Sequence, residues 1–213
     1  MLTVNEIFFS IQGESSHMGR PCVFVRLTGC DLPCVWCDTS YAFTEGEKQS
    51  VETVVAAVDA FGCSLVEITG GEPLLQNDVY PLMRTLLACG KTVLLETGGH
   101  VDISNVPQDV VKVVDVKCPG SGEVVRNDLA NLDRLALHDE VKFVIRDRSD
   151  YEFARALVHE HGLDGRGGAT LFSPVHRVLD PELLAEWVLA DRLPIRIQVQ
   201  LHKYLWGDEV RGV

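Results

Sequence analysis

The repeated alternation of strand-length apolar runs with segments of helical period is the feature that most limits the folds open to this chain. Such repetition implies parallel strands joined by right-handed crossovers, because each connecting helix must pack back onto the sheet. The predicted strands are mostly rich in β-branched residues and are bounded by turn residues. They are Cys22–Thr28, Leu65–Thr69, Thr92–Glu96, Val110–Val116, Glu140–Arg146, Ala169–Phe172 and Ile195–Leu201.

Residues that commonly begin helices stand between these runs. Serine, asparagine and aspartate side chains accept hydrogen bonds from the first free amides of a helix, and proline is tolerated in the first turn. The expected starts are Ser50 before a helix to about Phe61, Asn77 before a helix to Ala88, the capping box Ser149–Glu152, and Asp180 followed by Pro181.

These units predict an α/β fold, namely a partial (βα)6-type TIM barrel with parallel strands and some reduced helices. No linker or low-complexity stretch divides the chain, so we expect a single domain over residues 1–213. Barrel enzymes place their chemistry at the carboxyl ends of the strands. Polar residues that follow the predicted strands are therefore the first candidates for a site.

The charge balance limits the possible partners. The chain carries 31 acidic and 19 basic residues, for a net charge of −12, which argues against direct binding to nucleic acid. It has no apolar run long enough for a membrane span and no basic segment before an apolar core near Met1. We therefore expect a cytoplasmic protein whose seven cysteines form no disulfide framework.

Three of the cysteines lie close together directly after the first predicted strand. Cys30, Cys34 and Cys37 have the spacing C-x3-C-x2-C within GCDLPCVWCDT. A closed tetrahedral site needs four ligands, whereas an iron–sulfur cube held by three cysteines leaves one iron open to a small molecule. Two other interpretations remain at this point: three separately buried thiols, and a zinc site completed by a histidine such as His17.

A glycine pair follows the second predicted strand, in the segment Gly70–Gly71–Glu72–Pro73. Glycines let the backbone approach a ligand closely. Together with the cysteine loop and Trp36 before the last cysteine, this segment resembles the radical S-adenosylmethionine (SAM) superfamily.

Six segments spread over nearly the whole chain give a closer resemblance, to the 7-carboxy-7-deazaguanine synthase family. They are FSIQGES (Phe9–Ser15), G-R-P-x-x-F-V-R-L-T-G-C (Gly19–Cys30), WCDT (Trp36–Thr39), TGGEPL (Thr69–Leu74), LETGG (Leu95–Gly99) and QLHKYLWG (Gln200–Gly207). The resemblance implies a radical ring contraction of 6-carboxy-5,6,7,8-tetrahydropterin to 7-carboxy-7-deazaguanine. Ammonia is lost and SAM is used catalytically, in a pathway to queuosine and other 7-deazapurines.

The resemblance also implies the cofactors and the residues that hold them. Cys30, Cys34 and Cys37 would carry a [4Fe-4S] cluster, and the Thr39 hydroxyl would bind Mg²⁺, which prefers oxygen ligands. The residues expected to contact SAM are Trp36, Cys37, Asp38, Gly71, Thr97, Gly98, Lys117 and Ser173.

The resemblance also implies which residues contact the substrate. Arg26, costly inside an apolar strand, could bind the pterin carboxylate through both guanidinium nitrogens. Carboxylate, amide and backbone acceptors would face the N–H donors of the pterin. The expected substrate contacts are Ile11, Gln12, Gly13, Glu14, Arg26, Thr69, Glu96, His202 and the terminal carboxylate of Val213.

The chain departs from the family pattern after the fourth predicted strand. Many members carry Ser-Pro-Lys there, whereas this chain reads Asp115–Val116–Lys117–Cys118–Pro119. Lys117 keeps its expected place, but the SAM contact of the serine has no direct counterpart.

Two other functions explain part of the sequence. A glycyl-radical-enzyme activating enzyme would share the cysteine loop and the GGEP segment but not FSIQGES or QLHKYLWG. A non-catalytic zinc or iron–sulfur module would explain the cysteines alone. By analogy with the family we expect a homodimer and an electron donor such as flavodoxin, whose docking the acidic surface would influence.

Overall fold

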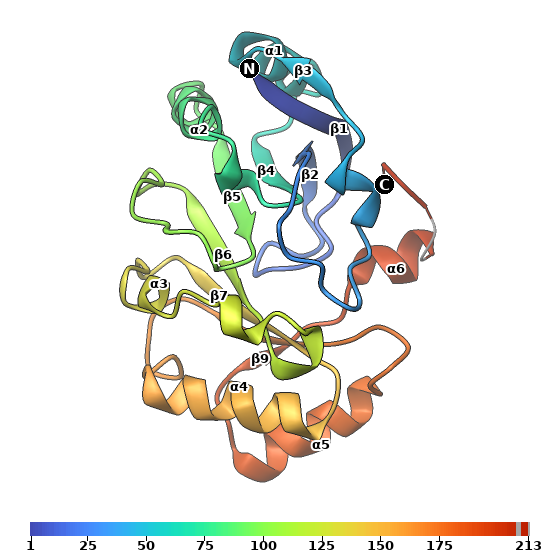
Figure 1. Ribbon diagram of the computed structural model, residues 1–213, viewed down its shortest axis with the longest axis vertical. Helices are drawn as coiled ribbons and strands as arrows, with labels where there is room; N and C mark the ends of the chain where they lie inside the picture. The colour runs from blue at the N-terminus through green and yellow to red at the C-terminus, as the bar shows by residue number, and fades with distance from the viewer. Residues whose placement is uncertain (208–209, 213) are drawn as a thin grey trace.

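The computed structural model describes residues 1–207 and 210–212, which form one nine-stranded sheet with most of the helices on its outer side (Figure 1). The strand order is β3-β1-β2-β4-β5-β6-β7-β8-β9. The strands are β1 (Leu2–Ile11), β2 (Pro21–Leu27), β3 (Glu47–Gln49), β4 (Leu65–Gly70), β5 (Thr92–Thr97), β6 (Val111–Val116), β7 (Glu140–Ile145), β8 (Thr170–Pro174) and β9 (Arg196–Ile197).

The helices differ in length around the sheet. The α-helices are α1 (Val51–Ala60), α2 (Val79–Ala88), α3 (Ala130–Asp133), α4 (Arg148–Glu160), α5 (Pro181–Asp191) and α6 (Leu201–Trp206). Short 3-10 turns are η1 (Ser40–Phe43), η2 (Pro73–Leu75), η3 (Pro119–Ser121) and η4 (Val124–Arg126). Across the described part of the chain, no helix has the length and apolar character needed to cross a membrane.

The parallel part of the sheet confirms the predicted partial barrel. Each pair from β2–β4 to β8–β9 is parallel, and the described strands β3 and β9 form two separate edges, so the barrel is open. The sequence prediction missed β1 and β3. Strand β1 pairs antiparallel with both β2 and β3, and it carries the FSIQ segment to the end of the sheet.

The start of each helix shows which capping predictions hold. The Ser50 hydroxyl accepts from the Thr53 amide, and the Asp180 carboxylate accepts from the Glu182 amide, as predicted. Two other predicted caps are wrong. Helix α2 begins after Asp78 rather than Asn77, and the cap of α4 is Asp147 rather than Ser149. The Asp147 carboxylate takes the Ser149 and Asp150 amides first, so the helix begins before the predicted capping box.

The predicted strand Ile195–Leu201 is mostly wrong, because only Arg196–Ile197 pairs with β8 and Leu201 begins α6. The side chains of this segment bond to the loop after β1 instead. Gln198 accepts from the Ser15 amide at 2.9 Å and donates to the Ser15 carbonyl at 2.8 Å. These two hydrogen bonds hold the C-terminal segment against the loop after β1, near the ends of the strands, instead of in the sheet.

The two faces of the sheet have different chemistry. Alternate residues of the strands, such as Val25, Ile68 and Leu95, pack outward against apolar side chains of the covering helices. Near the amino ends of the strands the inner face is apolar, and there Leu65 and Leu94 form a small cluster with Cys22 and Phe24. Towards the carboxyl ends the same inner face carries charged and polar side chains, which form the floor of a cavity.

Candidate functional site

A cavity of about 710 Å³ opens at the carboxyl ends of the strands and is lined by segments from both halves of the chain. The structure brings eighteen of the sequence-predicted residues to its wall: Ile11, Gln12, Gly13, Glu14, Arg26, Cys30, Cys34, Trp36, Cys37, Asp38, Thr39, Thr69, Gly71, Glu96, Thr97, Gly98, Lys117 and His202. Their individual roles stay predictions, but their placement around one space is a property of the fold.

One predicted residue is placed differently, and one lies outside the part of the chain that the structure describes. Ser173 lies in β8 beside Val144 of β7, is 3% exposed, and is not among the residues lining the cavity. Val213 lies outside the described residues. The SAM contact of Ser173 and the substrate contact of the Val213 carboxylate stay predictions.

The loop that carries the three cysteines is fixed on both sides. The Gly29 amide donates to the Ala42 carbonyl at 2.8 Å, and the Val35 amide donates to the Ser121 carbonyl at 3.1 Å. Asp31 within the loop lies 2.6 Å from the His100 ring nitrogen Nε2 and pairs with Arg126 at the same distance. The loop is therefore held against the ends of the central strands.

The cysteine side chains fit a cluster of iron and sulfide by their number, access and hydrogen bonds. All three are free thiols on the wall of the cavity, and the Leu32 amide donates to Cys30 Sγ at 3.4 Å, as amides do to cluster sulfurs. Burial raises the pKa of each thiol, and the Lys117 ammonium opposes this for Cys30, Cys34 and Cys37 alike. Among the described residues, no three His, Cys, Asp or Glu side chains converge tightly enough to hold a single metal ion.

The glycine pair after β4 packs directly on the cysteine loop. The Glu72 amide donates to the Gly29 carbonyl at 2.7 Å. A Cβ atom on Gly71 would lie 2.1 Å from the Gly29 oxygen and 3.0 Å from Cys30 Cβ. This position therefore requires glycine for close approach of the two loops.

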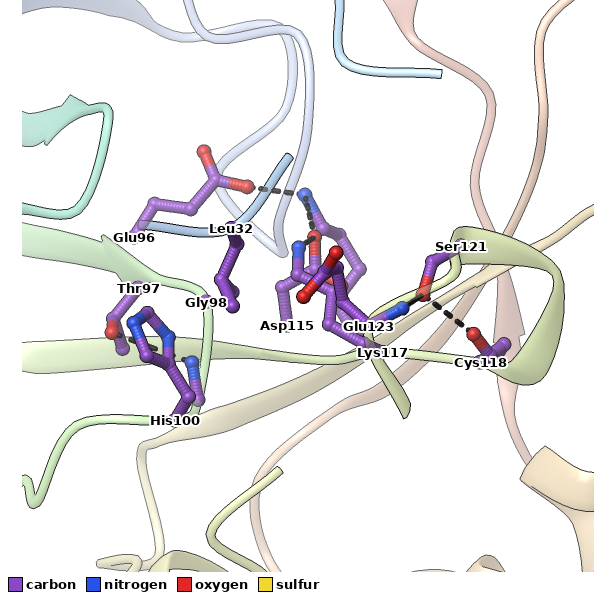
Figure 2. Close-up of polar contacts among 12 residues, drawn as sticks. Leu32, Glu96, Thr97, Gly98, His100, Asp115, Lys117, Cys118, Ser121 and Glu123 are labelled. Carbon is purple, nitrogen blue, oxygen red and sulfur yellow. Dashed lines mark hydrogen bonds and ion pairs between the residues drawn. The ribbon is translucent and has the colours of Figure 1, made fainter. Parts of the chain in front are cut away.

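The buried carboxylate of Glu72 fixes the end of the next strand. It accepts from the Thr97 hydroxyl at 2.9 Å, from the Gly98 amide at 2.7 Å and from the Leu74 amide at 3.0 Å. Figure 2 shows Thr97 and Gly98 beside His100, with Glu96 directed to the opposite side of β5. The predicted SAM contacts on this strand end thus rest on Glu72, which the sequence analysis noted only as part of the motif.

The floor of the cavity is acidic and contains one central ammonium group. Lys142 Nζ donates to Glu14 Oε2 at 2.8 Å and also to Glu96 Oε1, and lies 3.5 Å from Asp115 Oδ2. Burial alone would raise the pKa of Glu14, but the Lys142 charge and hydrogen bond lower it. For Glu67, burial and the neighbouring carboxylates together raise the pKa, which favours the protonated form of this side chain.

Arg26 and Thr69 lie next to each other on the same wall, because β2 and β4 pair them in register. Arg26 Nε donates to Glu6 Oε1 at 2.7 Å, and its guanidinium group lies 5.7 Å from the centre of the Phe8 ring. Glu6 and Phe8 belong to β1, the strand that the sequence analysis missed. An antiparallel strand therefore fixes the arginine predicted to bind the substrate carboxylate.

The C-terminal segment closes one side of the cavity. Leu201 donates its amide to the Gly13 carbonyl at 3.0 Å, and a Cβ atom on Gly13 would meet the His202 ring. Burial lowers the pKa of His202, so its ring is neutral at pH 7. Gln200 Nε2 donates to Glu14 at 2.9 Å and to Asp38 at 3.3 Å, which links the floor to the cysteine loop.

Asp38 and Thr39 lie between this segment and the cysteines. Lys203 Nζ lies 2.8 Å from Asp38 Oδ2. Burial acts to raise the pKa of Asp38, but Lys203, the Thr39 hydroxyl and His202 together lower it. Thr39 precedes η1, but its hydroxyl makes no capping hydrogen bond and donates to Asp38 Oδ1 at 3.0 Å. A helix-capping role does not explain this threonine.

The polar residues on the cavity wall that the sequence analysis missed include Glu67, Lys142, Gln200 and Lys203. A signal was present for two of them. Glu67 and Lys142 are charged residues inside apolar strands, the same argument that singled out Arg26. Gln200 and Lys203 belong to the QLHKYLWG motif, but their contacts with Glu14 and Asp38 depend on how the C-terminal segment packs against the strand ends.

Comparisons with known proteins show the family to which the chain belongs. Residues 24–186 match the Radical SAM superfamily. The chain is 49% identical to the 7-carboxy-7-deazaguanine synthase of Koribacter versatilis over 226 residues, with all of both chains covered. It is 45% identical to the synthase of the same name from Chlorobaculum tepidum, with 100% of this chain and 97% of the relative covered.

A solved structure matches over almost the same length. The crystal structure of QueE from Escherichia coli superposes with a TM-score of 0.73 at 25% identity, covering 94% of each chain. The similarity therefore extends over nearly the whole chain. This chain belongs to the radical SAM superfamily and, within it, to the 7-carboxy-7-deazaguanine synthases.

Proposed function

We propose that this protein catalyses the radical SAM ring contraction of 6-carboxy-5,6,7,8-tetrahydropterin to 7-carboxy-7-deazaguanine, with loss of ammonia. It would supply the base of queuosine and other 7-deazapurines and act upstream of any tRNA. The observation that carries the proposal is that one cavity joins a loop of three cysteines to an acidic floor. Full-length relatives named for this reaction favour it over the activation of a glycyl-radical enzyme.

The cysteine side of the cavity would hold the [4Fe-4S] cluster and SAM. Cys30, Cys34 and Cys37 would ligate three irons, leaving the fourth open. The chemistry that these groups supply when bound is the reductive cleavage of SAM to a radical that abstracts hydrogen from the substrate. Asp38, Thr97 and Lys117 would orient SAM, and the tight contact between Gly71 and Gly29 would fix its distance from the cysteines.

The floor would bind the pterin. Glu14 and Glu96 present carboxylate oxygens to ring N–H groups, which have no negative charge to repel. Arg26 would bind the substrate carboxylate, and the neutral His202 would pack over the ring from α6. Holding the substrate close to SAM contributes to catalysis by proximity, and the enclosing C-terminal segment would exclude water.

Magnesium is a further part of the proposal. Thr39 Oγ1 faces the cavity without a capping role, and Asp38 lies 3.0 Å away. Mg²⁺ keeps several waters and takes few protein ligands, so one hydroxyl together with substrate oxygens is a reasonable site. The ion would join substrate to the cysteine loop.

The decisive experiment is anaerobic reconstitution with iron and sulfide, followed by incubation with reductant, SAM, Mg²⁺ and the carboxytetrahydropterin. We expect the deazapurine chromophore and ammonia, with SAM recovered. A protein with an intact cluster that forms no deazapurine would contradict the proposal. Cys34→Ala should abolish the cluster absorption, while retention of zinc without such absorption would favour a zinc module.

Two partners are also proposed. A flavodoxin-like electron donor would approach the outer side of the cysteine loop, where the exposed Val35 offers apolar surface. A homodimer is favoured by the exposed apolar side chains of Tyr204, Leu205 and Trp206 on α6. Light scattering tests the dimer, and pulldown with reduced and oxidised flavodoxin tests the donor. A cytoplasmic location stays a prediction from the sequence.

A further inference from the structure

A buried ammonium group on β7 contacts carboxylates from three other parts of the chain. Lys142 is 6% exposed in its side chain. An ammonium group has three N–H donors, and the carboxylates of Glu14, Glu96 and Asp115 surround it. Its donors are therefore directed at protein oxygens, and Lys142 acts through them rather than on a ligand.

Lys117 has a different set of partners at the same end of the sheet. Its Nζ lies 3.1 Å from Asp115 Oδ2, and Figure 2 shows the two side chains together beside Glu96. Its charge also acts on Cys34, on the cysteine side of the cavity. Lys142 is thus the lysine that pairs with Glu14 and Glu96.

The contact of Lys142 with Glu14 matters because the floor is buried and holds further carboxyl groups. Glu67 is buried close enough to both Glu14 and Glu96 for their charges to act on it, and it accepts a hydrogen bond from Gln12. Burial and the charges of Glu96 and Glu14 raise the pKa of Glu67, which favours its protonated form. Burial also acts to raise the pKa of Glu14, but the charge and hydrogen bond of Lys142, together with Gln200 and His202, lower it. Without Lys142, the same burial would favour protonation of Glu14.

We infer that Lys142 is a positioning residue for substrate binding, whose ammonium group fixes Glu14 and Glu96 side by side as acceptors for ring N–H groups. The inference rests on the proposed function, because it assigns these carboxylates to the pterin. It predicts that loss of Lys142 weakens pterin binding while leaving the cluster and SAM in place.

The chain offers a matched control for burial and ion pairing. Lys112 of β6 is also buried and lies 2.9 Å from Asp139, which is 0% exposed. Neither residue lines the cavity. Lys112→Met should therefore lower stability as Lys142→Met does, but it should leave the substrate site unchanged.

The experiment uses anaerobically reconstituted protein with SAM and Mg²⁺ but without reductant, so that substrate binds and does not react. Calorimetric titration with the carboxytetrahydropterin gives Kd for wild type, Lys142→Met, Lys142→Gln and Lys112→Met. Electron paramagnetic resonance of separately reduced samples and SAM titration report the cluster and SAM sites. We expect a roughly hundredfold weaker pterin Kd for Lys142→Met, a smaller loss for Lys142→Gln, and wild-type values for Lys112→Met.

A measurement on the wild type covers the case in which neither Lys142 variant folds. The groups facing Glu14 are Lys142, Gln200 and His202, with Glu67 and Glu96 nearby on the floor. If Lys142 keeps Glu14 ionised, the pterin Kd should change less than about threefold between about pH 8 and about pH 5.5. A larger loss on acidification would overturn the inference.

The outcomes also separate this inference from the proposed function. No pterin binding by the wild type would contradict the proposed function itself. Pterin binding that is equal in wild type and in a folded Lys142 variant would overturn only the role of Lys142. Loss of the cluster or SAM signals together with pterin binding would show a general structural role and would also overturn it.

Discussion

Gly71 approaches Gly29 so closely that a methyl group on Gly71 would lie 2.1 Å from the Gly29 carbonyl oxygen. The contact joins the turn after β4 to the loop of the three cysteines. Because the obstacle is backbone on a loop fixed at both ends, Gly71→Ala should displace the cysteine loop. We expect a loss of about 1–3 kcal/mol in stability and a lower iron content after reconstitution.

Iron and sulfide analysis with urea unfolding checks this expectation, and Gly165→Ala is the control. A Cβ atom on Gly165 would meet only the Gly162 oxygen, at 3.9 Å. Full iron content in Gly71→Ala would show that the loop can move aside without losing the cluster.

Arg26→Lys should weaken substrate binding although the charge is kept. The guanidinium group of Arg26 is fixed by Glu6 and lies 5.9 Å from the centre of the Tyr41 ring. Lysine cannot form the planar two-nitrogen contact with a carboxylate, so we expect KM for the pterin to rise about 10–100-fold. Steady-state kinetics measures KM in Arg26→Lys and in the control Arg155→Lys. Arg155 is an ion-paired arginine on α4. An unchanged KM would remove Arg26 from the substrate site.

The sequence could predict the parallel part of the fold because β2 and β4 to β8 are apolar runs of the right length with clear boundaries. It could not predict β1, whose polar Asn5, Glu6 and Ser10 interrupt the alternation and whose partner strands run antiparallel. The end of the chain was also misassigned. Arg196–Gln200 has strand composition, but the side chains of Gln198 and Gln200 find partners in the loop after β1.

The candidate site was largely predictable because its residues cluster at strand ends and in short motifs. Sequence alone could not show which charges meet across the barrel. Glu14 and Lys142 are 128 positions apart and touch only because β1 adds to the sheet and the barrel curves. Pairings of this kind depend on register and curvature, which no local pattern records.

Thr39→Val should raise the Mg²⁺ concentration needed for half-maximal activity. Valine keeps the shape of threonine but removes the hydroxyl, so one oxygen ligand would be lost. We expect a shift of about tenfold or more, with little change in cluster content. Magnesium titration of the turnover rate measures the shift. Thr85→Val on α2 is the control, since the Thr85 hydroxyl donates to the Pro81 carbonyl within the same helix and Thr85 does not line the cavity. An unchanged Mg²⁺ response in Thr39→Val would place the ion elsewhere.

Glu67→Gln should change how stability depends on pH. Burial and the charges of Glu96 and Glu14 raise the pKa of Glu67 well above its ordinary 4.5 in the folded protein. Above that ordinary value, the unfolded wild-type chain releases this proton while the folded protein keeps it. The folded state then binds more protons than the unfolded state, so the contribution of Glu67 to stability falls as pH rises.

Glutamine mimics the protonated acid at every pH, so the advantage of Glu67→Gln over wild type should grow from acid to neutral pH. The slope should be at most about 1.4 kcal/mol per pH unit, and it should end where the folded wild type also loses the proton. Urea unfolding of both reconstituted proteins over a pH series measures the difference, and Glu160→Gln on the exposed side of α4 controls for the substitution itself. A difference that stays constant across the series would mean that the pKa of Glu67 is not raised in the folded protein, contrary to the expectation.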